Sequence, residues 1–173
     1  MSKKALIIID MLNDFMDEAG ALYCGETARA IIPFIKERLL TSRRDGDLVV
    51  FLKDSHDECD KEFERFPDHC VENTWGSEII AELAPEPQEK IIPKKRFSGF
   101  FGTNLENILE TGGITEVEVV GVCTSICVMD TVGGLADRDY PITVPRKGVA
   151  DFDAEFHDFA LKRMKQIYGA DVS

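Results

Sequence analysis

With 173 residues, the chain is long enough for one hydrophobic core, and we expect a single domain over residues 1–173. Its 20 basic and 32 acidic residues give a net charge of −12, which disfavours nucleic acid and anionic membrane surfaces as partners. No stretch approaches the roughly 18 consecutive apolar residues of a membrane span, and no cleavable signal precedes the first strand pattern. Five cysteines are an odd number for a disulfide framework. We therefore expect a cytoplasmic protein with reduced thiols.

Short apolar runs alternate with helical periods along the chain. In chain order they predict a strand at residues 4–9, a helix at about 26–44, a strand at 48–52, a short helix at 77–84, a strand at 90–93, a helix around 105–109, a strand at 117–120, a helix at about 125–137, a strand at 141–144 and a final helix. The polar loop over residues 53–76 has no clear period, and loops of that length are uncommon unless they are functional.

Local signals predict where some helices begin and end. Thr103 or Asn104 is the expected cap of the helix around residues 105–109, and a Gly-Gly pair ends it. Thr124 or Ser125 is the expected cap of the helix at 125–137. In the final helix, the apolar residues that keep the helical period are Phe156, Phe159, Ala160, Met164 and Ile167.

The alternation of strands and helices predicts an α/β fold, in which helices cover both faces of a parallel sheet in a three-layer α/β/α sandwich. Ligands bind such sheets at the carboxyl ends of the strands, near a switch in strand order. Asp10, Asp54, Lys94 and Cys127 follow the first four predicted strands in turn. We expect these four side chains to face one crevice.

Three of these residues have the chemistry of a nucleophilic site. Cys127 falls in the first turn of its predicted helix, where free backbone N–H groups and the helix dipole favour a thiolate. A thiol nucleophile also needs a base and a positive neighbour. Asp10 can be the base, and either Lys94 or Lys95 can be the cation. Cys123 and Cys127 would also suit a metal- or redox-sensing module, but no second cysteine pair accompanies them.

A second group of residues has the chemistry of a metal site. Asp54 stands two residues before His56, and His69 follows in the same polar loop. Imidazole and carboxylate groups are ligands of zinc, iron and manganese, and Glu62 could supply a further oxygen. His157 falls on the final helix, where we expect it to be structural or exposed.

Five sequence blocks carry a resemblance to a known family. They are Ala5-Leu6-Ile7-Ile8-Ile9-Asp10 with Asn13-Asp14-Phe15, Asp54-Ser55-His56-Asp57-Glu58, Phe66-Pro67-Asp68-His69-Cys70, Lys94-Lys95-Arg96-Phe97-Ser98-Gly99-Phe100 and Gly121-Val122-Cys123-Thr124-Ser125-Ile126-Cys127-Val128. Because these blocks occur in this order from the first strand to the last helix, the chain resembles the nicotinamidase and isochorismatase-like cysteine hydrolases. The resemblance implies the isochorismatase-like hydrolase fold.

By this resemblance, Asp10 is the base, Cys127 is the nucleophile, and the first lysine of its block, Lys94, is the catalytic lysine. The resemblance also implies a cis peptide bond between Val122 and Cys123. The backbone N–H groups of Cys123 and Cys127 would then form an oxyanion hole.

The resemblance further implies one divalent metal ion, with zinc as the first expectation and iron or manganese as alternatives. Its ligand positions match Asp54, His56, His69 and either Glu62 or Glu64, of which Glu62 is the expected ligand. Phe15 and Phe66 match positions where aromatic side chains sandwich the substrate ring.

The activity implied by the resemblance is hydrolysis of nicotinamide to nicotinate and ammonia through a cysteine thioester, a step of NAD salvage. Nicotinamide is then the expected partner, and homo-oligomerisation stays open. One alternative is a related isochorismatase-like amidase or hydrolase with another small substrate. A different class is a phosphoacceptor signalling domain, because Asp10, Asp54 and Lys94 mimic its acidic pocket with a lysine. Such a domain has no need of Cys127 or His69.

Overall fold

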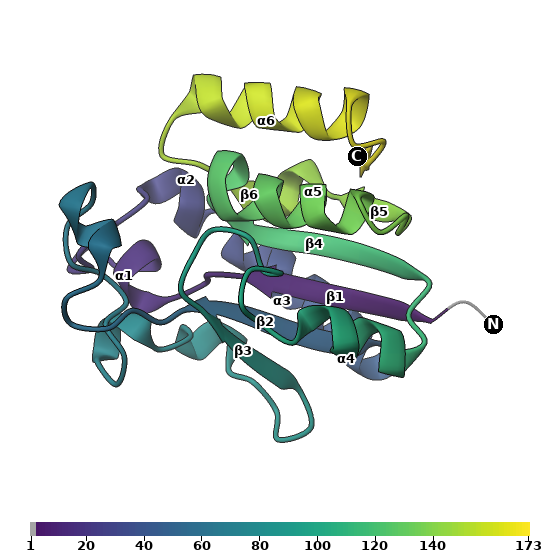
Figure 1. Cartoon of the computed structure of the whole chain (residues 1–173), viewed down its shortest axis with the longest axis horizontal. Coiled ribbons are helices and arrows are strands. Elements are labelled where there is room, and N and C mark those ends of the chain that lie inside the picture. Colours follow the sequence, from purple (N-terminus) through teal and green to yellow (C-terminus); the bar gives the residue numbers. More distant parts are fainter. Residues whose placement is uncertain (1–2) are drawn as a thin grey trace.

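The computed structural model describes residues 3–173, in which strands and helices alternate along the chain (Figure 1). The strands are β1 (Lys4–Ile9), β2 (Leu48–Asp54), β3 (Lys90–Lys94), β4 (Glu116–Val122), β5 (Ile142–Val144), β6 (Val149–Ala150) and β7 (Asp171–Val172). The α-helices are α1 (Asn13–Met16), α2 (Glu26–Arg29), α3 (Ile32–Asp45), α4 (Leu105–Gly112), α5 (Met129–Ala136) and α6 (Ala154–Gln166). Short 3₁₀ turns cover Lys61–Glu64, Trp75–Ser77, Ala81–Leu83 and Arg146–Gly148, and a π-helical turn, Thr124–Val128, leads into α5.

The strands form one parallel sheet in the order β3-β2-β1-β4-β5-β7, and β6 pairs with β4. The chain runs outward from β1 through β2 to β3 and then returns to β4 on the other side of β1. The switch in strand order therefore lies between β1 and β4, where a doubly wound sheet opens a crevice at its carboxyl edge.

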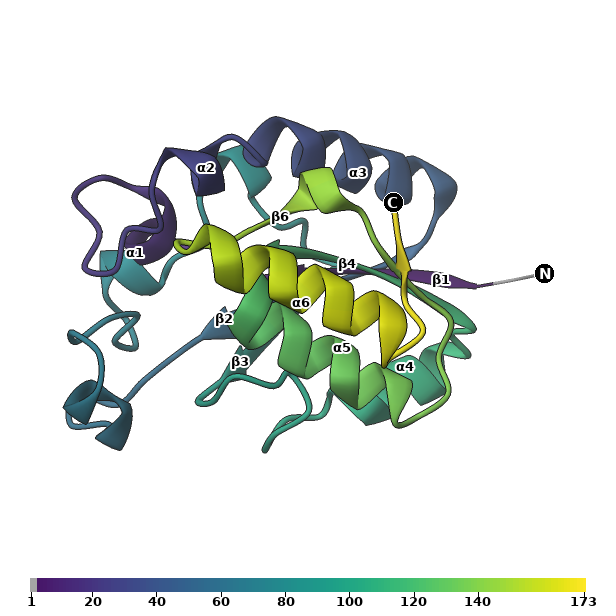
Figure 2. The ribbon, with the colours of Figure 1, turned by 90° about the horizontal axis from the view of Figure 1, so that it is seen from above.

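Helices cover both faces of this sheet, as Figure 2 shows from above. On the face of α4, α5 and α6, Ile7 of β1 packs in one core with Leu161 of α6. On the face of α3, Leu6 of β1 packs in a second core with Ile35 of α3. Because successive strand residues point to opposite faces, a strand buried on both sides must be apolar along its buried length, as β1 is from Ala5 to Ile9. The predicted three-layer α/β/α fold is confirmed.

Some predicted helix boundaries are wrong. The helix expected at residues 26–44 is two helices, α2 and α3, because Pro33 lies at the start of α3, where its missing N–H costs no hydrogen bond. The expected loop after β1 contains the single-turn helix α1. Residues 77–84 contain no α-helix and are flanked or covered by two 3₁₀ turns. For α4 the prediction is right: the Thr103 hydroxyl accepts the N–H of Leu105, and Gly113 ends the helix with a φ of 63°.

The helix that carries Cys127 begins one residue earlier than predicted, and neither Thr124 nor Ser125 caps it with its side chain. The N–H of Ser125 instead donates to the Asp151 carboxylate at 2.7 Å, so the cap comes from a loop 26 residues away. The final helix also differs from its apolar pattern. Its buried residues are Ala160, Leu161 and Met164, whereas Phe156, Phe159 and Ile167 are exposed.

Among residues 3–173, no helix is long and apolar enough to cross a membrane.

Candidate active site

The carboxyl ends of the first three strands bring three charged side chains together below the crevice. Asp10 follows β1 with a φ of 52°, a conformation that aspartate tolerates better than most residues. Its Oδ1 accepts the backbone N–H of Asp54 at 2.9 Å, and Asp54 is the register partner of Lys94. The register of the sheet therefore sets the positions of all three groups.

Lys94 is the centre of this cluster. Its buried ammonium lies 2.8 Å from Oδ2 of Asp10 and 3.4 Å from Sγ of Cys127, and it also bonds Oδ1 of Asp54. Lys95, by contrast, is exposed and pairs with Asp57 at the surface. Side chains alternate between the two sides of a strand, so only one of these neighbouring lysines can point into the cluster. Lys94, rather than Lys95, is therefore the cation next to Asp10 and Cys127.

Burial governs the protonation of this cluster. Burial, followed by the charge of Asp54, raises the pKa of Asp10 to about 6 even though Lys94 opposes the shift. Burial lowers the pKa of Lys94, but Asp10, Asp54 and Cys127 outweigh it and raise that pKa well above its ordinary value. Burial also raises the pKa of the Cys127 thiol well above its ordinary value, against the effect of Lys94. The expectation that the helix start holds Cys127 as a thiolate is therefore wrong, and the thiol needs a base.

The end of β4, just before the turn that carries Cys127, makes a close approach to β1. Gly121 has a φ of 121°, and a Cβ at this position would lie 2.1 Å from the carbonyl oxygen of Ile9. The next peptide bond but one, Val122 to Cys123, is cis, as the resemblance implied. On the far side, the hydroxyl of Thr124 lies 2.9 Å from Nδ1 of His157, so this histidine has a structural contact. The segment from Gly121 to Cys127 is thus held between β1 and α6.

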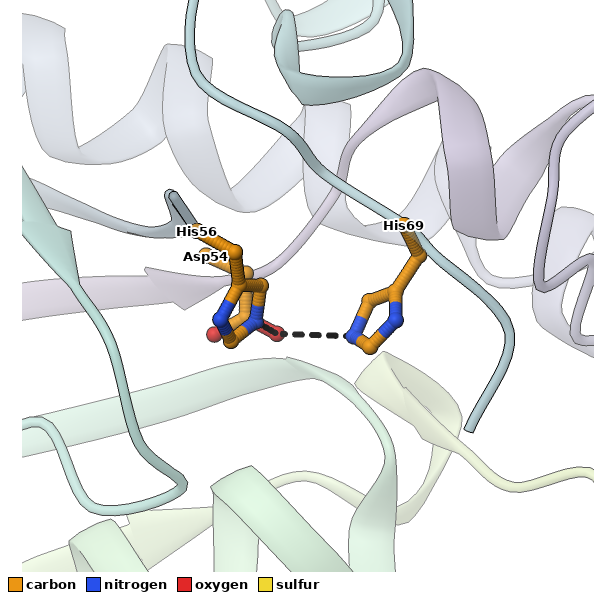
Figure 3. Close-up of side chains that lie close together, drawn as sticks. All are labelled: Asp54, His56 and His69. Atoms are coloured by element: carbon orange, nitrogen blue, oxygen red, sulfur yellow. Dashed lines mark ion pairs between the residues drawn. The ribbon is translucent and has the colours of Figure 1, made fainter. Parts of the chain in front are cut away.

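Asp54, His56 and His69 form a buried cluster (Figure 3). Asp54 joins this cluster to Lys94, whose ammonium it binds. One possible ligand atom from each residue lies within 4.8 Å of the other two. Nε2 of His56 is 3.7 Å and Nε2 of His69 is 3.9 Å from Oδ2 of Asp54. Three buried ligand atoms around one point are the donor set that a divalent ion such as zinc requires.

The hydrogen bonds of both histidines favour this use. Nδ1 of His56 lies 3.2 Å from Oδ2 of Asp60, and Nδ1 of His69 lies 2.7 Å from the carbonyl oxygen of Pro67. An acceptor at Nδ1 leaves the lone pair of Nε2 free to bind a metal. Nε2 of His56 and Oε2 of Glu62 are also buried without a hydrogen-bond partner. These unpartnered atoms fit a metal ion.

Glu62, rather than Glu64, faces the cluster. Glu62 is buried and lines the pocket next to His69, whereas Glu64 is exposed. Asp60 positions this turn, because its Oδ1 accepts the N–H of Glu62 at 2.9 Å and both its oxygens lie 3.0 Å from the Arg96 guanidinium. Burial raises the pKa of Asp60, but these donors outweigh it and hold that pKa below its usual range.

A pocket that is partly open to solvent includes Cys127 in its lining. Its polar edge contains Asp10, Asp54 and Glu62, and its walls are aromatic or aliphatic. Phe15 and Phe66 both line it, with ring centres 5.7 and 6.2 Å from the ring of His69. A small, mainly apolar pocket with a few convergent polar groups suits a planar molecule of one ring.

Sequence reasoning missed several residues of this site. Phe97 and Phe152 also line the pocket. Phe63 packs against both histidines of this cluster, with ring centres 5.4 and 5.6 Å from His56 and His69. Phe97 stands inside the Lys94 block, which was a usable signal. Phe63 and Phe152 lie outside every block, and only the folded loops bring them to the site.

Comparison with known proteins agrees with this geometry. Residues 4–173 match the family model described as "Isochorismatase domain". A nicotinamidase/pyrazinamidase, PncA from Bacillus subtilis, has a crystal structure that superposes with a TM-score of 0.94 at 39% identity, covering 99% of both chains. A pyrazinamidase of Pyrococcus horikoshii, solved in complex with zinc, superposes with a TM-score of 0.92 at 32% identity, covering 99% of this chain and 98% of the other.

A relative from Arabidopsis thaliana is 33% identical over 94% of this chain and 88% of its own length, and its name is "Probable inactive nicotinamidase". The family model spans nearly the whole sequence, and the strand order, the buried cysteine and the full-length structural matches agree with it. The chain therefore belongs to the isochorismatase-like hydrolase family.

Proposed function

We propose that this protein is a nicotinamidase, which hydrolyses nicotinamide to nicotinate and ammonia and so serves NAD salvage. The proposal depends mainly on one observation, the three contacts of the Lys94 side chain. Its ammonium contacts Asp10, Cys127 and Asp54, and so joins a nucleophilic centre to a candidate metal site within one ring-sized pocket. Similarity to nicotinamidases over the full chain supports the same substrate class.

The residues proposed to hold a divalent ion, zinc before iron or manganese, are Asp54, His56, His69 and Glu62. When bound, the ion would act as a Lewis acid toward the nitrogen of the pyridine ring and so orient the ring. Support comes from the unpartnered Nε2 of His56 and Oε2 of Glu62, and from the zinc complex of the similar pyrazinamidase.

The aromatic walls hold the substrate ring in this proposal. Phe15 and Phe66 offer flat apolar surface to a pyridine ring, whose burial supplies binding energy without any charge. A ring held between them and turned toward the histidines would bring its carboxamide carbon near Cys127. Holding the two reacting groups together in this way removes much of the entropic barrier to attack.

Asp10 is the proposed general base. Because burial keeps Cys127 in its thiol form, the carboxylate of Asp10 takes the thiol proton as Sγ attacks the carboxamide carbon. The backbone N–H groups of Cys123 and Cys127 would bind the oxyanion. Asp10 then gives the proton to the departing nitrogen, which leaves as ammonia, and a thioester remains on Cys127.

The thioester is then cleaved by water. Asp10 takes a proton from the water as its oxygen attacks the thioester carbon, and the carbon–sulfur bond breaks to release nicotinate. The proton returns to Cys127, which restores the starting state. Throughout the cycle, Lys94 compensates the negative charge that moves between Asp10 and Cys127 in a site from which water is largely excluded.

An ammonia-release assay on nicotinamide, pyrazinamide and a panel of ureido acids tests the proposal. We expect turnover of both pyridine-type amides by the wild type, loss of turnover in Cys127→Ala, and loss of bound metal by elemental analysis in His56→Ala. Turnover of a ureido acid without turnover of either pyridine-type amide would instead assign the chain to another branch of the family. Because one similar protein, from Arabidopsis, is named a probable inactive nicotinamidase, turnover by the wild type is the measurement that decides the proposal.

The alternatives from other classes have less support. In a phosphoacceptor signalling domain of the flavodoxin-like type, the sheet order is 2-1-3-4-5, whereas here β1 lies between β2 and β4. A sensing module built on Cys123 and Cys127 would need their thiols to face each other. The Sγ of Cys123 instead lies 3.5 Å from the Sγ of Cys24.

A further inference from the structure

One backbone N–H of the turn that carries Cys127, Thr124–Val128, is bonded from outside that turn. Within the turn, two N–H groups donate to the carbonyl oxygen of Cys123, at 3.1 and 3.2 Å. The N–H of Ser125 donates instead to Oδ2 of Asp151 at 2.7 Å. Because Ser125 stands only two residues before Cys127, this bond anchors the start of the turn that holds the nucleophile.

The sheet places Asp151 beside this turn. The two residues of β6 pair in parallel register with Gly121 and Val122, the last residues of β4. Asp151 directly follows β6, so it leaves the sheet at the same carboxyl edge at which β4 passes into Cys123. Its carbonyl oxygen accepts the hydroxyl of Thr27 on α2 at 3.5 Å, which ties the segment down on its other side. The pairing of β6 with β4 therefore brings this acid to the turn.

Both oxygens of the Asp151 carboxylate accept hydrogen bonds. Oδ2 accepts the N–H of Ser125, and Oδ1 accepts the N–H of Asp153 at 3.3 Å. The residue is only 6% exposed, and a buried carboxylate is costly unless hydrogen bonds satisfy it. A bond to a charged acceptor is also stronger than one between neutral groups. The two bonds together fix the plane of the carboxylate and keep Oδ2 on Ser125.

The charge of Asp151 does not itself favour the proposed reaction. Attack by Cys127 places negative charge on the substrate oxygen, and a further negative charge in the neighbourhood opposes that change. What the carboxylate contributes to the site is therefore geometric. It holds the backbone of the turn in one position.

We propose that Asp151 is a positioning residue of the reaction, which holds the N–H of Ser125 and so aims Cys127 at the carboxamide carbon. This role rests on the proposed function, because it concerns the same nucleophile. A turn released from Asp151 would present the Sγ and the backbone N–H of Cys127 in a range of positions. The rate of attack depends steeply on the alignment of these groups with the substrate.

The expected kinetic signature separates positioning from substrate binding. Phe15 and Phe66, the side chains proposed to hold the ring, belong to other segments of the chain. In Asp151→Ala we therefore expect kcat to fall about 10- to 100-fold, while KM stays within about twofold of the wild type. Phe152, the next residue, lines the pocket, so a variant that only displaced this segment would raise KM instead.

Two further variants separate the hydrogen bond from a general loss of stability. Asp151→Asn keeps an oxygen that accepts the N–H of Ser125, so its kcat should stay within about threefold of the wild type. Asp153→Ala is the matched control, because its carboxylate caps α6 by accepting the N–H of Phe156 at 2.9 Å. Thermal melts should show similar losses of stability in the two alanine variants, whereas kcat should fall only in Asp151→Ala.

An aldehyde analogue tests the alignment without turnover. The thiol of Cys127 adds to pyridine-3-carbaldehyde, so that a bond forms between Sγ and the carbonyl carbon and the thiol proton goes to the carbonyl oxygen. Calorimetry on the zinc-loaded protein should show about tenfold weaker binding of this aldehyde to Asp151→Ala than to the wild type. Binding of 3-methylpyridine, which has the ring but no carbonyl group, should differ by less than about twofold.

Amide hydrogen exchange tests the bond itself and needs no substrate. Followed by NMR, the N–H of Ser125 should exchange at least about tenfold faster in Asp151→Ala than in the wild type, because its acceptor is lost. In Asp153→Ala its exchange rate should be unchanged.

Three results would overturn the proposal. One is a kcat of Asp151→Ala within about twofold of the wild type. Another is an equal loss of kcat in Asp153→Ala, because the effect would then be a general loosening of the segment. The third is an Asp151→Asn variant as slow as Asp151→Ala, because the charge and not the accepted bond would then matter.

Failure of the proposed function would look different. A wild type that hydrolyses a ureido acid but neither pyridine-type amide would refute the nicotinamide substrate alone. The same comparison of kcat, made with that ureido acid, and the exchange rate of the Ser125 N–H would still decide the role of Asp151.

Discussion

Asp60 is the residue whose replacement tests the metal site most sharply, because it touches the site without being one of its proposed ligands. Its carboxylate contacts Nδ1 of His56 at 3.2 Å and accepts the N–H of Glu62 at 2.9 Å. It also lies 3.0 Å from the guanidinium of Arg96. Asp60→Ala removes all three contacts at once but leaves every proposed ligand in the sequence.

The magnitude follows from these contacts. Losing the partner that orients a ligating histidine typically weakens metal binding by about 10- to 100-fold, which is about 1.4 to 2.7 kcal/mol. We expect the upper half of this range, because Arg96 already lies 3.9 Å from Oε2 of Glu62 and, once freed from Asp60, would draw Glu62 away from the metal. Asp60→Asn should be intermediate, since an amide oxygen can still accept the N–H of Glu62.

The assay is a zinc titration of the purified protein in competition with a chelator, followed by ammonia release from nicotinamide at saturating zinc. Affinity should fall in Asp60→Ala, whereas activity at saturating metal should recover, because the nucleophile is untouched. Asp57→Ala is the matched control. Asp57 is also an acid of this loop and pairs with Lys95 at 2.6 Å, but its side chain is 66% exposed and touches no proposed ligand.

The reasoning fails if Asp60→Ala binds zinc within about twofold of the wild type. It also fails if Asp57→Ala loses as much affinity, because the effect would then come from the charge of the loop and not from the contacts of Asp60.

Three further predictions concern the nucleophile, the close approach of two strands and one ion pair. Replacing Cys127 with alanine should abolish ammonia release while leaving zinc binding unchanged, which a titration would show; retained turnover would remove Cys127 from the mechanism. Gly121→Ala should cost at least about 3 kcal/mol, because its Cβ would meet the carbonyl oxygen of Ile9 at 2.1 Å. Gly102→Ala, where a φ of 66° meets open space, should cost about 1 kcal/mol, and thermal melts would compare the two variants. Burial raises the pKa of Glu89, but the hydrogen bond from Arg43 and that from the Glu86 N–H outweigh it, so its pKa is lowered on folding. Glu89→Gln should therefore cost about 1 to 2 kcal/mol at pH 7. A lowered pKa contributes its full stabilisation above the unfolded value of about 4.3 and loses it as the pH falls through the lower folded value. The difference between the two proteins should therefore shrink below about pH 4.3 and be lost once Glu89 is protonated in the folded protein, and a difference that persists at still lower pH would contradict the assignment.

The elements with strong periods could be predicted from the sequence alone. β1 is apolar from Ala5 to Ile9 because both its faces are buried there, and α4 stops before Gly113 because the residue that follows the helix needs a positive φ. The two-residue strands β6 and β7 could not be predicted. A segment of two residues has no period, and its identity as a strand depends on hydrogen bonds to β4 and β5, which are distant in the sequence.

The same division holds for the candidate site. The blocks around Asp10, Lys94 and Cys127 were sufficient to predict the family, because their residue types and their order resemble those of the family. The sequence did not predict residues whose role is to position other site residues by contacting them. Asp60 is one acid among several in a polar loop, and only the folded loop brings its carboxylate to His56 and Glu62.

By itself, the sequence determined the α/β architecture, the family and the side chains available for chemistry, because these depend on local patterns and on residue identity. Only the tertiary structure decided how those side chains are used. Burial keeps Cys127 as a thiol, against the expectation from its place in a helix. The packing of α6 leaves Phe156 and Phe159 at the surface, although their spacing is that of a buried face. Both outcomes depend on which surfaces meet when distant segments fold together, and no local pattern contains that information.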